Sequence, residues 1–170
     1  MTAGSLRPIA SSPEVSRRMR STRQRDTEPE VALRVEVRKL GLRYRIDRQV
    51  LPELRRRADL VFVSARVAVF VDGCFWHRCP VHRTQPVANA DWWDSKLRAN
   101  ERRDRDTDLR LARAGWTVMR VWEHERPAAA AIRLARVVRS GLRRGGRSLR
   151  GATALARGLS APDAGRRQHA

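Results

Sequence analysis

Residues 58–73 read ADLVFVSARVAVFVDG, two β-branched, apolar runs separated by a short polar turn. Near-continuous valines are typical of strands buried on both faces, so we expect this segment to form the centre of a sheet. Asp59 opens the first run and Asp72 ends the second. A carboxylate beside a buried strand needs compensation, and carboxylates at the ends of paired strands can share one Mg²⁺. Asp72 followed by glycine is equally typical of a plain turn.

The flanking sequence predicts an α/β fold, a small sheet flanked by helices. Before the central runs we expect a helix over 27–40, opened by a capping box of Thr27 and Glu30, and a short strand at 42–46. After them we expect an irregular loop over 74–90, a helix to Gly115, a strand at 116–122 and a helix from Pro127. The predicted domain spans 26–144, between a basic arm over 1–25 and a disordered tail over 145–170 rich in arginine, glycine and alanine.

The chain is strongly basic. Its 170 residues include 37 lysines and arginines against 18 acids, a net charge of +19, and only Lys39 and Lys96 are lysines. Arginine matches phosphate oxygens and guanine edges, so DNA or RNA is the expected partner. An arginine bias of the whole proteome is the plainer explanation of part of this excess. No segment is long and apolar enough to span a bilayer or act as a signal peptide, so we expect a cytoplasmic protein without a membrane partner.

The stretch CFWHRCPVHR at 74–83 combines metal-ligand residue types. Cys74, Cys79 and His82 have the spacing C-x4-C-x2-H, which favours a structural zinc site. His124, which follows the strand at 116–122, is the best distant candidate for a fourth ligand, while His77 is a competing one. The alternative is a pair of buried free thiols with surface histidines.

Aromatic residues stand beside arginines in and after this loop. Phe75 and Trp76 lie within the predicted zinc loop, and Trp92 and Trp93 open the next helix. Such side chains can wedge between base steps and kink a duplex, and Met19 in the basic arm is a further apolar candidate. Core packing is the commoner role of any single tryptophan.

Several segments together resemble the very-short-patch-repair (Vsr-type) DNA mismatch endonucleases. They are SRRMRSTRQRDTEPE, ADLVF, VFVDGCFWHRCPVH, the WW..KL..N..RD pattern and GWTVMRVWEHE, in that order between about Arg17 and Glu125. The resemblance implies a fold like that of restriction endonucleases, with a small mixed sheet, a zinc-stapled loop and a Mg²⁺-dependent phosphodiesterase site. It also implies nicking on the 5′ side of the thymine in T:G mismatches, which arise when 5-methylcytosine deaminates.

The resemblance also assigns roles to residues of this chain. The metal-binding aspartate falls on Asp59, and the backbone-carbonyl ligand of Mg²⁺ falls on Val71. The catalytic histidine falls on His77, and the helical acid that orients metal-bound water falls on Asp104. The N-terminal catalytic glutamate falls on Glu30. The intercalating residues fall on Phe75, Trp76 and Trp93, with Met19 at the N-terminal wedge.

The chain departs in places from the pattern of some family members. Some carry histidine where this chain has Asp72, which we keep as a catalytic candidate. Some bind zinc through C-x4-H-x-C and a distant cysteine, whereas the equivalents here are Cys74, Cys79, His82 and His124.

The expected function is therefore that of a monomeric mismatch endonuclease acting on double-stranded DNA. Mismatch-repair proteins and a DNA cytosine-5 methyltransferase system are its expected partners. Two alternatives remain open at this point. One is a zinc-stabilised DNA-binding protein without catalysis, and the other is a related endonuclease of different DNA specificity.

Overall fold

The computed structural model of the chain describes residues 25–82 and 86–157, with side chains as far as Arg144. Met19 and most of the basic arm lie outside these residues. In chain order, the elements are α2 (Glu28–Lys39), β1 (Arg45–Gln49), β2 (Arg57–Phe62), β3 (Val67–Asp72), α3 (Ala90–Arg113), β4 (Thr117–Trp122) and α4 (Pro127–Arg157). No helix among the described residues combines the length and the apolarity that crossing a membrane requires.

The four strands form one mixed sheet in the order β1-β2-β3-β4. β1, β2 and β3 pair antiparallel, whereas β3 and β4 run parallel, with Val67 opposite Thr117 and Asp72 opposite Trp122. Because β3 and β4 point the same way, their carboxyl ends lie side by side. The segments that follow these two strands, from residues 73 and 123, therefore start at the same edge of the sheet.

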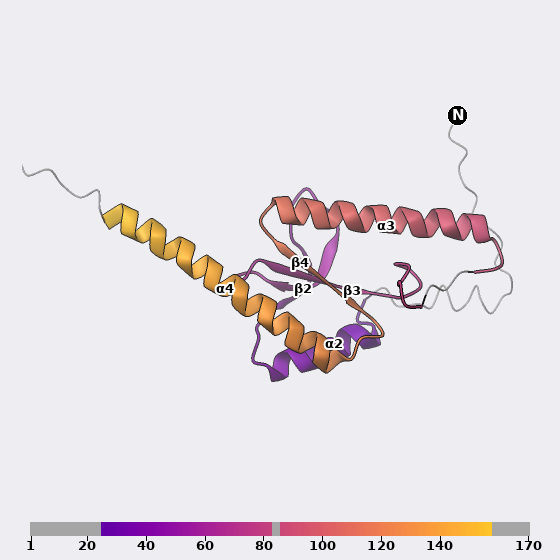
Figure 1. Ribbon diagram of the computed structural model, residues 1–170, viewed down its shortest axis with the longest axis horizontal. Coiled ribbons are helices and arrows are strands. Elements are labelled where there is room, and N and C mark those ends of the chain that lie inside the picture. Colours follow the sequence, from indigo (N-terminus) through magenta and orange to yellow (C-terminus); the bar gives the residue numbers. More distant parts are fainter. Residues whose placement is uncertain (1–24, 83–85, 158–170) are drawn as a thin grey trace, which may run out of the picture.

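Helices cover both faces of the sheet, as the valine-rich strands predicted (Figure 1). On one face, Leu33 of α2 and Leu134 of α4 pack with the strand residues Leu60 and Val69. On the other face, Leu111 of α3 packs against a second cluster that includes strand residues from β2 and β3. The prediction of an α/β fold with a small mixed sheet between helices is confirmed.

Two boundaries differ from the sequence-based expectation. β1 begins at Arg45 rather than at residue 42, because the residues after α2 first form a turn at Gly41, where φ is +70°. α4 continues past Gly145 to Arg157, into the segment assigned to the tail. Arginine, leucine and alanine are strong helix formers, and their propensity offsets the cost of the glycines. Residues 158–170 lie outside the described part.

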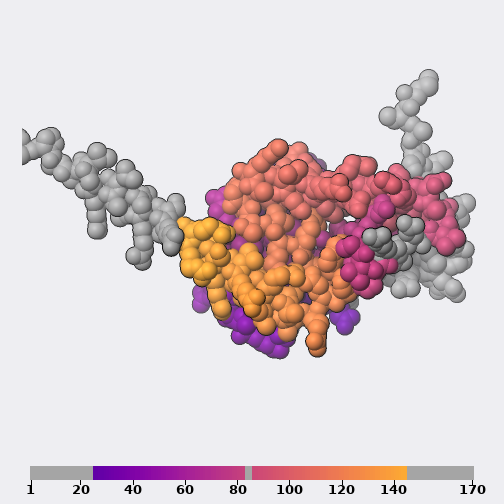
Figure 2. Space-filling view, in the orientation of Figure 1, coloured from indigo at the N-terminus to yellow at the C-terminus, as the bar shows by residue number. Residues whose placement is uncertain are grey.

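The segment after β3 lies at one end of the molecule. In the space-filling view it forms the magenta surface next to the orange start of α4, while the yellow part of α4 lies at the opposite end (Figure 2). The predicted site residues of this segment are therefore gathered at the end where β3 and β4 finish.

Candidate active site and metal centre

The loops after β3 and β4 are tied to each other by hydrogen bonds. The Glu123 amide donates to the Asp72 carbonyl over 2.9 Å, and the Cys74 amide donates to the Glu123 carboxylate over 2.6 Å. Within the first loop, the Cys79 amide donates to the Cys74 carbonyl over 2.9 Å. These contacts place a short, irregular segment firmly against the end of the sheet.

This arrangement brings together the four residues predicted to bind zinc. Cys74, Cys79, His82 and His124 each offer a ligand atom, and these atoms all lie within 4.8 Å of one another. The Cys74 Sγ is 3.0 Å from the His124 Nδ1, and the Cys79 Sγ is 3.6 Å from the His82 Nδ1. A tetrahedral zinc site with ordinary bond lengths has ligand separations of roughly 3.3–3.8 Å, so the donor set fits a metal ion.

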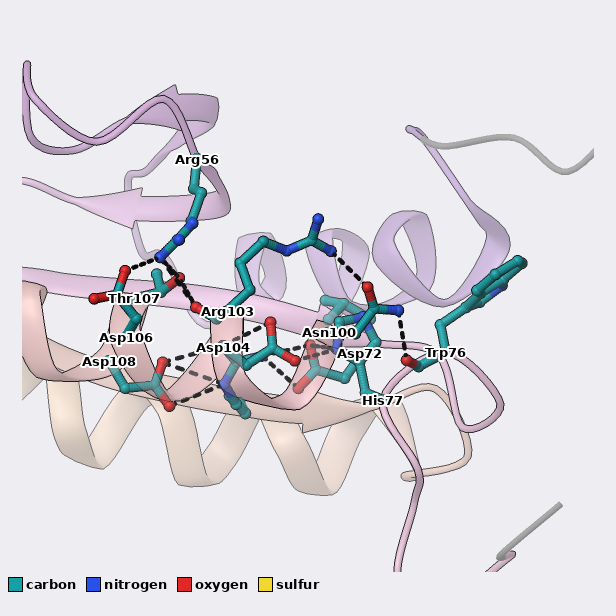
Figure 3. A network of polar contacts seen from close by, with 12 residues as sticks. Arg56, Asp72, Trp76, His77, Asn100, Arg103, Asp104, Asp106, Thr107 and Asp108 are labelled. Atoms are coloured by element: carbon teal, nitrogen blue, oxygen red, sulfur yellow. Dashed lines mark hydrogen bonds and ion pairs between the residues drawn. The ribbon is translucent and has the colours of Figure 1, made fainter. Parts of the chain in front are cut away.

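His77 is absent from that cluster, although its spacing made it a competing ligand. Its Nδ1 lies 2.6 Å from a carboxylate oxygen of Asp104 on α3 and 3.8 Å from one of Asp72 (Figure 3). A carboxylate can only accept, so Nδ1 carries the hydrogen and Nε2 is the nitrogen left for other partners. Burial lowers the pKa of the His77 imidazole. The hydrogen bond with Asp104 and the charge of Asp72 together outweigh burial, so the net pKa lies above its ordinary value.

Asp59 lies on β2, beside the C-terminal end of β3. Its Oδ2 accepts a hydrogen bond from the Val71 amide over 2.6 Å. Burial raises the pKa of this carboxyl to about 7, the Val71 bond opposes the shift, and the charges of Glu30 and Asp72 add to it. A partly buried carboxyl beside other acids is a position that a bound cation would stabilise.

Glu30 reaches this group from α2 and is itself buried. Its carboxylate accepts hydrogen bonds from the Asp26 amide at 3.0 Å and from the Thr27 hydroxyl at 2.7 Å. The capping box predicted for Thr27 and Glu30 is not formed, because the Thr27 side chain makes no hydrogen bond to a helix amide and Glu30 accepts from the Asp26 amide instead of the Thr27 amide. The threonine hydroxyl donates to the glutamate instead.

The aromatic residues of the loop pack as a group against the start of α3. The ring centroids of Phe75 and Trp76 are 5.1 Å apart, and each ring also contacts Trp93, at 5.1 and 5.9 Å. Trp93 is only 8% exposed, whereas Phe75 and Trp76 are partly exposed. The Asn100 side chain donates to the Trp76 carbonyl over 3.0 Å and so holds the loop on α3. Trp92 packs edge-on against Trp93.

Sequence reasoning missed Arg120, which forms ion pairs with Asp72 and Asp108. The available signal was a charged residue inside the apolar strand TVMRVW, since a buried charge needs a partner. Sequence reasoning also missed Glu123, whose carboxylate holds the Cys74 amide. Asp72, a catalytic candidate, is buried, and Arg120 donates to both of its carboxylate oxygens.

Comparison with known proteins identifies the family of this chain. The family model described as DNA mismatch endonuclease Vsr matches residues 10–83. The chain is 48% identical to the type II nicking enzyme V.NaeI of Lentzea aerocolonigenes, over 69% of this chain and 73% of that protein. It is 39% identical to the nicking enzyme V.XorIIP of Xanthomonas oryzae, over 63% and 77% of the two chains. It is 36% identical to the DNA mismatch endonuclease Vsr of Escherichia coli, over 64% and 68%. The chain therefore belongs to the Vsr family of DNA mismatch endonucleases.

Proposed function

We propose that the chain nicks one strand of double-stranded DNA on the 5′ side of the thymine in a T:G mismatch, with Mg²⁺ as the catalytic ion. One observation carries this proposal. His77 directly follows the partly exposed Phe75 and Trp76 in the chain, and it is hydrogen-bonded to Asp104. The pair lies beside Asp72, whose charge raises the pKa of both His77 and Asp59. A proton-transfer group, an acidic cluster and an aromatic wedge thus share one end of the sheet.

Three features support DNA as the substrate. The relatives named above are DNA mismatch or nicking endonucleases by name. The chain carries a net charge of +19, which favours binding to the phosphate backbone. Its site also holds aromatic side chains, which can enter a base stack where a mismatch makes the duplex easier to deform.

The Asp59 carboxylate and the Val71 carbonyl would hold the magnesium ion. The raised pKa of Asp59 supports this assignment, because burial, with a smaller effect from the charges of Glu30 and Asp72, disfavours the bare carboxylate that a bound cation would stabilise. A magnesium ion bound there would polarise the scissile phosphate and help ionise water. Glu30 lies close enough to influence the Asp59 charge and extends this acidic group to α2.

His77 would exchange a proton with a reacting oxygen at the scissile phosphate. Its Nδ1 is held by Asp104, so the ring orientation is fixed and Nε2 is free to face the substrate. The raised pKa keeps more of the imidazole protonated near neutral pH than an unperturbed histidine would allow. Asp104, on the rigid helix α3, thereby fixes the geometry of the transfer.

The Cys74, Cys79, His82 and His124 cluster would hold zinc as a structural ion. Zinc there would join the loop after β3 to the loop after β4, two segments with little apolar core of their own. Phe75 and Trp76 lie between the two cysteines, so this staple would fix the pair that enters the DNA. The buried Trp93 would support the pair from behind.

Asp59→Asn should slow nicking by about 100-fold while the affinity for a T:G duplex stays within a few-fold of wild type. Losing roughly 3 kcal/mol of transition-state stabilisation corresponds to about a 100-fold slower reaction. Single-turnover cleavage of an end-labelled duplex measures the rate, and a binding assay in Ca²⁺ measures the affinity. Glu53→Gln, at an exposed loop position, is the matched control. Wild-type nicking by Asp59→Asn would place the active site elsewhere.

Cys79→Ser should lose its bound metal and melt several degrees lower than wild type. Elemental analysis of the purified protein should find about one zinc per wild-type chain and almost none in the variant. Val81→Ala, at a 72% exposed position of the same loop, should keep its zinc. Wild-type protein purified without chelators that contains no zinc would reject this role for the cluster.

Trp76→Ala should lose about 10- to 100-fold in affinity for a T:G duplex, since stacking contributes roughly 1–3 kcal/mol per base. The loss on matched DNA should be much smaller, because arginine–phosphate contacts dominate there. The ratio of the two affinities, at one salt concentration, is the quantity to measure. Trp76→Phe, which keeps a stacking ring, should retain most of the ratio. An unchanged ratio in a folded Trp76→Ala protein would assign Trp76 to loop packing alone.

A further inference from the structure

Arg120 forms ion pairs with three acidic side chains, Asp72, Asp104 and Asp108. It stands in β4, and its side chain is only 20% exposed. Its Nη1 lies 2.8 Å from both carboxylate oxygens of Asp72. Its Nε and Nη2 contact Asp108 on α3 at 3.1–3.3 Å, and Nη2 is also 3.5 Å from Asp104.

The two acids that contact His77 are therefore both held by the same guanidinium. Asp104 and Asp72 lie 2.6 and 3.8 Å from the His77 Nδ1. Asp72 is almost fully buried, with its side chain 4% exposed, so its charge depends on Arg120 for compensation. Without that cation, three neighbouring carboxylates would repel one another, and Asp104 would be free to turn away from the imidazole.

The donors of Arg120 are directed at protein groups. A guanidinium has five N–H bonds in a fixed plane. Nη1 faces Asp72, while Nε and Nη2 face the carboxylates of α3, and the Phe70 ring lies 5.1 Å from the guanidinium carbon on one side. This geometry suits a residue that fixes other side chains better than one that reaches for a DNA phosphate.

We propose that Arg120 is a positioning residue for nicking, which holds Asp104 and Asp72 in place so that His77 keeps its orientation toward the scissile phosphate. This inference rests on the proposed function, because it assigns His77 to proton transfer. It goes further in placing the control of the histidine on β4, a strand that contributes no side chain to the proposed magnesium site. Arg120 acts through the two carboxylates and does not itself touch the substrate.

Arg120→Met should reduce the single-turnover nicking rate by roughly 100-fold, the loss typical of a displaced catalytic group. The affinity for the T:G duplex should remain within about three-fold of wild type, because no DNA contact is removed. This change corresponds to less than about 1 kcal/mol of binding free energy. Arg120→Lys, which keeps the charge but not the planar fork, should fall between the two. Arg110→Met, which removes an exposed ion pair of α3, is the matched control and should nick normally.

A second comparison separates positioning from simple charge compensation. Asp72→Asn removes the buried charge that Arg120 neutralises, so the double variant Asp72→Asn with Arg120→Met leaves no unpaired carboxylate at that position. The double variant should melt near the temperature of Asp72→Asn alone. The double variant should nevertheless nick about 10-fold more slowly than Asp72→Asn alone, because Asp104 has lost its ion pair with Arg120. Equal nicking rates in Asp72→Asn and in the double variant would overturn the proposal.

An activity-independent measurement keeps this inference separate from the proposed function. The side-chain Nδ1–H of His77 should give a shifted, slowly exchanging NMR signal because of its bond to Asp104. That signal should be lost in Arg120→Met and kept in Arg110→Met. An unchanged signal in Arg120→Met would overturn the positioning role even if the chain nicks DNA. Wild-type protein that shows the signal but never nicks would instead contradict the proposed function.

Discussion

The parallel pairing of β3 with β4 is the constraint on which the site depends. It ends both strands at one edge of the sheet, where the Glu123 amide continues the ladder to the Asp72 carbonyl. Cys74 and His124, 50 positions apart in the chain, come within 3.0 Å only because of this register. A shift of one residue would turn Asp72 away from Arg120 and separate the two halves of the metal cluster. The same edge also receives a carboxylate from each side of the sheet, Glu30 from α2 and Asp104 from α3.

The charges of the site are arranged in two halves with different compensation. On the α3 side, Arg120 forms ion pairs with Asp72, Asp104 and Asp108, and Asp104 also holds His77, so each of these acids has a basic partner within the protein. On the α2 side, burial and, to a lesser extent, the charge of Glu30 raise the pKa of Asp59 to about 7, which marks a group that a cation from solution would stabilise. A strongly basic chain thus keeps a small acidic centre. The net positive charge of the chain suits the phosphate backbone, while the acids suit the magnesium ion of the proposed function.

Local patterns predicted much of this structure, and long-range contacts account for what they missed. The valine runs located β2 and β3, and the spacing of Cys74, Cys79 and His82 identified three of the four residues of the Cys/His cluster, because these signals lie within a few residues. His124 followed from expecting its strand beside β3. Arg120 was not predicted, since its partners lie 12 and 48 positions away and no periodicity records them. The extension of α4 was missed because glycines were weighed above the helix formers around them.

Strand-specific mapping of the nick would show whether this end of the sheet cuts DNA at a mismatch. Duplexes that differ only in one central pair, T:G, G:C or A:T, would be end-labelled on each strand in turn and incubated with excess protein, with and without Mg²⁺. We expect a single break on the 5′ side of the thymine in the T:G duplex, only with Mg²⁺, and intact matched duplexes. Equal cleavage of the matched duplexes, cleavage without a divalent ion, or tight T:G binding without any break would contradict it.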